Sequence, residues 1–150
     1  MTRGVVTRIV LTLVGATLLI VSAFLPWLGF EGGPRGTEVP VQFLWSPAER
    51  PAPAFVASLG FVAIVLGLLV IAGLAPRTGV LTSLAGAAAI AVFVLAVTTL
   101  YRVEGEGSDL GVQDIGIGAS LELLGGIVAL IGGFFGARSV NRGAAPVATA

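Results

Sequence analysis

Apolar residues dominate four long stretches of the chain, and segments rich in glycine, proline and charged residues separate them. Each stretch has the roughly 20 residues that an α-helix needs to cross a hydrocarbon layer about 30 Å thick. The pattern predicts an all-α membrane protein, an antiparallel bundle of four transmembrane helices. These helices are expected at about residues 9–30, 54–74, 80–101 and 115–136.

The composition agrees with a membrane protein. Of 150 residues, 56% are hydrophobic and 11% are charged, and the mean hydropathy is +1.04. A soluble domain would have about 25% charged residues. The helices use most of the chain and leave little for a soluble domain. We therefore expect one membrane domain over residues 1–142, followed by a disordered cytoplasmic tail over residues 143–150.

The residue types that are missing exclude several kinds of chemistry. The chain has no Cys and no His, and all eight basic residues are Arg. Thiolate or imidazole metal sites, histidine-ligated haem, Ser–His nucleophiles and lysine Schiff bases are therefore impossible. No glycine cluster resembles a nucleotide-binding loop, and no basic cluster suits a nucleic acid. We expect no enzymatic activity, no cofactor, no metal site and no nucleic-acid partner.

Arginine placement predicts the orientation, because cytoplasmic loops of membrane proteins carry an excess of Lys and Arg. Five arginines and no acidic residue fall in the two tails and the turn at 75–79: Arg3, Arg8, Arg77, Arg138 and Arg142. The two longer loops carry three arginines and seven acidic residues. Both termini of this multi-pass plasma-membrane protein should therefore be cytoplasmic. Whether the first helix is cleaved as a signal peptide after 21–23 stays open; its apolar run continues to Phe30, which favours a retained helix.

The first long loop carries the candidate contacts for a partner. Trp27 follows Pro26 at the end of the first apolar stretch, which suits either an anchor in the headgroup layer or a docking motif. The β-branched and aromatic residues after Thr37 predict a short strand outside the membrane. Its apolar end should dip to the bilayer surface or contact a partner. These end residues are Phe43, Leu44 and Trp45.

Glu122 is the one acidic or basic residue inside the predicted helices, about 10 Å below the outer end of the last one. Residues three and four positions away on its helical face are Gly or Ala, so this face should pack against other helices. An ionised carboxylate at this depth costs a few kcal/mol, which protonation or a hydrogen-bond donor relieves. Donors predicted at similar depth are Ser22, Ser58, Thr98, Thr99 and Arg102. Glu122 is either a structural hydrogen-bond site or a proton or cation site.

The chain resembles the small four-helix membrane proteins of high-GC Gram-positive bacteria. The resemblance is carried by Phe24-Leu25-Pro26-Trp27, by a long first loop ending near Trp45, and by a glycine-rich last helix around Glu122. It implies a location and an architecture, but no activity. The layout is also similar to claudin-like tetraspans. However, the paired loop cysteines and the Gly-Leu-Trp sequence of claudins are absent, so a barrier role does not carry over.

Two functional hypotheses follow. The first is a non-enzymatic accessory or scaffold protein of the bacterial plasma membrane, whose outer loops contact an envelope partner. The second is a small oligomeric transporter or channel that uses Glu122. Partners expected under either hypothesis are the lipid bilayer and another membrane protein or further copies of the chain.

Overall fold

The computed structural model describes residues 3–29, 33–46, 50–75, 79–103 and 115–141. These residues form an all-α bundle of four helices, with two short 3-10 helices in the first long connection. The elements are α1 (Arg3–Ser22), η1 (Val41–Leu44), η2 (Phe55–Ala57), α2 (Leu59–Ala72), α3 (Val80–Val103) and α4 (Ile117–Asn141). The predicted tail at 143–150 lies outside the described residues.

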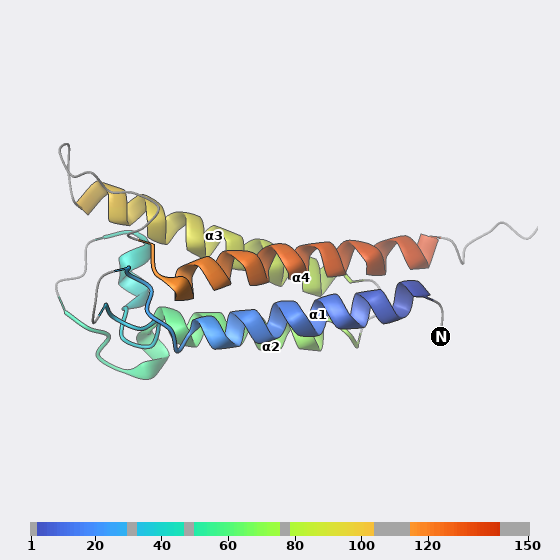
Figure 1. The fold of residues 1–150 in the computed structure, drawn as a ribbon, viewed down its shortest axis with the longest axis horizontal. Coiled ribbons are helices and arrows are strands. Elements are labelled where there is room, and N and C mark those ends of the chain that lie inside the picture. The colour runs from blue at the N-terminus through green and yellow to red at the C-terminus, as the bar shows by residue number, and fades with distance from the viewer. Residues whose placement is uncertain (1–2, 30–32, 47–49, 76–78, 104–114, 142–150) are drawn as a thin grey trace, which may run out of the picture.

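Helices α1 and α3 each pack against α2 and α4, so the bundle closes on itself. The start of α1 and the end of α4 lie at the same end of the bundle (Figure 1). The end of α2 and the start of α3 are also there, whereas the first long connection folds over the opposite end (Figure 1). The part of α1 that carries Arg3 and Arg8 and the part of α4 that carries Arg138 therefore lie at the same end of the bundle.

Within the described residues, three helical segments are long and apolar enough to span a membrane: Gly4–Ser22, Val80–Arg102 and Ile117–Phe135. Helix α2 has 14 residues and rises about 21 Å, which is less than the hydrocarbon thickness. The chain is a small helical membrane protein that contacts the lipid bilayer. The expected helix at 54–74 is shorter because Ser58 caps α2, with its side-chain oxygen accepting a hydrogen bond from the Phe61 N–H at 3.1 Å.

Small residues fill the interior of the bundle, and large apolar residues lie outside. The buried apolar residues between the helices are mainly alanine, for example Ala63, Ala85, Ala89 and Ala129. The exposed ones include valine, leucine, isoleucine and phenylalanine along all four helices. This distribution suits lipid as the solvent, because helices in a membrane associate through close contact of small residues. The small face of α4 that carries Glu122 is buried, as expected.

The connection after α1 folds into a compact unit, which we call the head; its described residues are 23–29, 33–46 and 50–58. Backbone hydrogen bonds hold the head together and join it to α2. Within the head, the Thr37 N–H donates to the Ala23 carbonyl at 3.0 Å, and from α2 the Gly60 N–H donates to the Gly36 carbonyl at 2.7 Å. Gly60 has to be glycine, since a Cβ there would lie 2.6 Å from the Thr37 nitrogen.

Two predictions for this region are wrong. The head contains no strand within its described residues; Val41–Leu44 forms a 3-10 helix, and only isolated bridges such as Pro40 with Ser58 occur. The first helix ends at Ser22 and not at Phe30. Residues 23–29 instead pair with the next part of the head, since the Trp27 N–H donates to the Pro34 carbonyl at 2.9 Å and Pro26 forms an isolated β-bridge with Arg35.

Candidate functional site

Glu122 is fully buried, in the second turn of α4, and its partner comes from α1. The Ser22 hydroxyl lies 2.7 Å from Glu122 Oε2 and 2.7 Å from the Leu19 carbonyl oxygen. Glu122 is 0% exposed, and its Oε1 has no hydrogen-bond partner among the described residues. The pair joins α1 to α4 across the most closely packed face of the bundle.

Close backbone contact is what brings α1 and α4 together near this pair. A Cβ on Gly125 would lie 3.0 Å from the Gly15 carbonyl oxygen, and one on Gly118 would lie 2.7 Å from the Trp27 ring. Each glycine sits one turn from Glu122 on the same helical face. The small residues that the sequence pattern picked out therefore hold the carboxyl group against α1.

The other predicted donors lie elsewhere. Ser58 donates to the Phe55 carbonyl at 2.6 Å and caps α2. Thr98 donates to the Val94 carbonyl of its own helix, and Thr99 donates to the Leu44 carbonyl of the head at 3.2 Å. Arg102 is exposed in the last turn of α3. Ser58 caps α2, which packs on α1 and α3, while Thr98 and Thr99 bond to α3 and the head. Of the five predicted donors only Ser22 reaches Glu122.

Trp27 is an interior residue and neither a headgroup anchor nor an exposed docking residue. Its side chain is 4% exposed, and its Nε1–H donates to the Ser22 carbonyl oxygen at 3.0 Å. The chain turns back into the bundle after α1, which places the indole between the head and α4. Trp27 thus connects the head to the residue that bonds Glu122.

The three apolar residues predicted as one contact patch divide into two groups. Phe43 and Leu44 are partly buried and pack on the cluster that contains Trp27, Val39, Leu59, Ala96 and Ala119. Trp45, one residue after η1, is 66% exposed. Only Trp45 of the three therefore presents most of its side chain to the surroundings.

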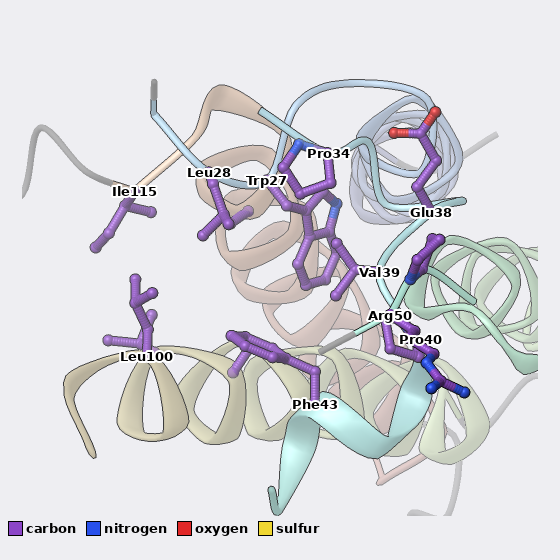
Figure 2. Close-up of a pocket in the computed structure, with 14 residues that line it drawn as sticks. Trp27, Leu28, Pro34, Glu38, Val39, Pro40, Phe43, Arg50, Leu100 and Ile115 are labelled. Carbon is purple, nitrogen blue, oxygen red and sulfur yellow. The ribbon is translucent and has the colours of Figure 1, made fainter. Parts of the chain in front are cut away.

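A pocket of about 280 Å³ lies at the head end of the bundle, between the head and helices α3 and α4. Figure 2 shows Trp27, Phe43 and Leu100 pointing toward a shared space, with Leu28 and Ile115 beside it. The lining is otherwise apolar except for Glu38 and Arg50, both of which are exposed. Sequence patterns missed this pocket because the head and α3 that form it are far apart in the chain.

A second buried contact was also missed. Arg8 is 9% exposed, and its Nη2 donates to the Gly73 carbonyl at the C-terminal end of α2 at 3.0 Å. A cation at a helix C-terminus is favourable because carbonyl groups there carry partial negative charge. Arg8 was expected in the N-terminal tail, but in the structure it lies inside the candidate span Gly4–Ser22 and joins α1 to α2.

Among the described residues there is no group of three or more acidic, His or Cys side chains that could hold a metal ion. No protein-family model matches the chain, and neither a curated protein nor a solved structure matches it. The described residues form a small helical membrane protein with a folded head, a buried Ser22–Glu122 pair and an apolar pocket between the head, α3 and α4.

Proposed function

We propose that this protein is a non-enzymatic accessory or scaffold protein of the bacterial plasma membrane, which contacts an envelope partner through its head. The proposal rests on the exposure of Trp45. Its side chain is 66% exposed, whereas backbone hydrogen bonds join the head to the helix bundle. A large aromatic side chain on a pre-ordered surface loses little conformational freedom on binding, and Trp is enriched among residues that dominate interface energies.

The surroundings of Trp45 are fixed by several contacts. Its own N–H donates to the Gln42 carbonyl at 3.1 Å, and the preceding Leu44 carbonyl accepts from Thr99 of α3 at 3.2 Å. Phe55 and Val56 of η2 are further exposed apolar residues of the head, 47% and 64% exposed. These residues supply the apolar contacts that a protein partner needs.

The proposed orientation puts the head outside the cell and both termini in the cytoplasm. It is supported by the sequence, in which the two tails and the turn at 75–79 carry arginines and no acidic residue, whereas the two longer connections carry seven acidic residues. Arg8 adds nothing to this argument, because its side chain is buried between α1 and α2. The bacterial location follows the resemblance to small four-helix membrane proteins.

Site-specific photocrosslinking tests the accessory role. A photoreactive amino acid in place of Trp45 should capture one protein of defined mass in native membranes, because the partner covers this side chain. The same amino acid in place of Val94, which is 51% exposed on α3, is the matched control and should capture lipid only. If the Trp45 position also captured only lipid, Trp45 would be a headgroup anchor and the accessory role would be wrong.

One observation favours the alternative, a small oligomeric transporter or channel. The fully buried Glu122 carries an oxygen, Oε1, without a hydrogen-bond partner in the described part of the chain, and buried carboxyl groups often mark proton or cation paths. Glu122→Gln separates the two functions, because it keeps the shape of the side chain but cannot release a proton. If the protein is a transporter, the unmodified protein should show proton or cation flux in reconstituted vesicles, and the Glu122→Gln variant should show none. The accessory role predicts no flux in either protein.

A further inference from the structure

The pocket at the head end is bounded by residues at the end of two candidate spans. Ala96, Val97 and Leu100 of its wall belong to the span Val80–Arg102, and Ala119 belongs to the span Ile117–Phe135. Leu100 is two residues, or about 3 Å, from Arg102 and Ala96 is about 9 Å from it. The pocket therefore lies where the acyl chains of a bilayer meet the headgroups.

The lining has the chemistry of an acyl-chain site. Aromatic and aliphatic side chains from the head and from α3 and α4 surround the space, including Trp27, Phe43 and Leu100 (Figure 2). The charged lining residues are Glu38 and Arg50, both exposed at the edge of the pocket. The Glu38 carboxylate already has a partner within its own turn, since its Oε2 accepts a hydrogen bond from the Arg35 N–H at 3.0 Å. The Arg50 guanidinium suits a phosphate group.

The walls of the pocket are held in place before any ligand binds. The Trp27 indole is fixed by its hydrogen bond to the Ser22 carbonyl, and the head is attached to α3 by the bond from Thr99 to Leu44. At about 280 Å³ the pocket is just below the roughly 300–1,000 Å³ of sites for whole drug-sized molecules. A single chain segment fits this space better than a complete lipid.

We propose that this pocket binds one acyl chain of a membrane phospholipid, with the phosphate of its headgroup near Arg50. The lipid would fill the space between α3, α4 and the head and would link the head to the surrounding bilayer. This inference does not depend on the accessory role or on transport, because it concerns only the walls of the pocket and the solvent around them.

Tryptophan fluorescence tests the proposal directly, because the chain has two Trp residues and only Trp27 lines the pocket. In a Trp45→Phe protein, Trp27 is the sole emitter. After reconstitution into phosphatidylcholine vesicles with brominated acyl chains, its emission should be strongly quenched compared with unbrominated vesicles. Bromine quenches indole only at short range, and Trp27 is 4% exposed, so strong quenching requires a chain inside the pocket.

A matched pair of substitutions on α3 supplies the control. Val97 lines the pocket, whereas Val94 is exposed on the same helix and does not line it. Val97→Phe, in the Trp45→Phe protein, should fill the pocket and lose most of the quenching, whereas Val94→Phe should keep it. Equal quenching in the two variants, with helix content equal to that of the parent, would overturn the proposal.

Native mass spectrometry of the unmodified protein gives an answer even if Val97→Phe does not fold. Protein extracted from membranes in mild detergent should carry one bound molecule with the mass of a phospholipid. Arg50→Gln should release this molecule at lower collision energy. A protein without any bound lipid, or one with a bound molecule that is not a phospholipid, would contradict the assignment.

Discussion

Ser22 has one hydroxyl proton and two oxygen neighbours at 2.7 Å, the Leu19 carbonyl and Glu122 Oε2. A hydroxyl donates one hydrogen bond and accepts others, so it cannot donate to both oxygens at once. Both contacts of Ser22 are satisfied if Ser22 donates to Leu19 while a protonated Glu122 donates to Ser22 through Oε2. The other oxygen, Oε1, has no partner among the described residues in either case. The neutral side chain also avoids the cost of an ion in lipid.

Two substitutions at this pair should differ in their effect on stability. Glu122→Gln should cost less than about 1 kcal/mol of unfolding free energy, because a Gln amide can also donate to Ser22 Oγ. Ser22→Ala should cost about 1–3 kcal/mol, because it leaves a buried carboxyl group without its partner. Unfolding in mixed micelles with a denaturing detergent measures both. A larger cost for Glu122→Gln than for Ser22→Ala would show that the carboxylate itself is needed.

At the scale of elements, glycines decide how closely the helices approach. A Cβ on Gly15 of α1 would lie 2.9 Å from the Ala129 nitrogen, and one on Gly86 of α3 would lie 2.7 Å from the Gly126 carbonyl oxygen. Both neighbours are backbone atoms of α4, which cannot move aside as a flexible side chain does. Helix α4 therefore packs directly against the backbones of α1 and α3.

We expect Gly15→Ala and Gly86→Ala each to destabilise the bundle by about 1–3 kcal/mol, because they force these helices apart. Gly4→Ala is the matched control, since a Cβ there meets nothing within 4 Å. It should be neutral or slightly stabilising, because alanine favours a helix more than glycine does. The same unfolding measurement tests all three variants. Equal effects at the three positions would rule out tight backbone packing.

The helices at 80–101 and 115–136 could be predicted from the sequence because lipid selects long apolar runs. Glu122 is the one acidic or basic residue within these two runs. The small face of α4 was also visible, since Gly125, Gly126 and Ala129 repeat at helical spacing around Glu122. These features are local in the sequence. The folded structure keeps these helices and their small faces, because each helix satisfies its own backbone hydrogen bonds.

The features that could not be predicted depend on contacts between distant segments. Trp27 follows Pro26 at the end of the first apolar stretch, which predicted a headgroup anchor or a docking motif. In the structure the chain turns back at Pro26, and the Trp27 ring is buried. The 3-10 turn at Val41–Leu44 replaced a strand because no neighbouring strand is available for pairing among the described residues of the head. Ser22 and not Ser58 reaches Glu122, because α1 packs against α4 whereas Ser58 caps α2, which packs against α1 and α3.

In a membrane protein, lipid covers the large apolar side chains on the outside of the helix bundle. Because the chain has no Cys, single cysteines can report on this claim at positions in the middle of the candidate spans. Val14, Val94 and Ile127 are suitable, with 45%, 51% and 39% of their side chains exposed in the absence of lipid. Trp45→Cys in the head is the water-exposed control.

The decisive measurement uses a charged maleimide that does not enter lipid. It labels these cysteines in purified protein reconstituted into phospholipid nanodiscs, where no partner covers position 45 and water reaches both membrane faces. Maleimides react with the thiolate, which does not form in hydrocarbon. The account predicts rapid labelling of Trp45→Cys and almost none of Val14→Cys, Val94→Cys and Ile127→Cys. Rapid labelling at all four positions would mean that water surrounds the bundle, and the account would be wrong.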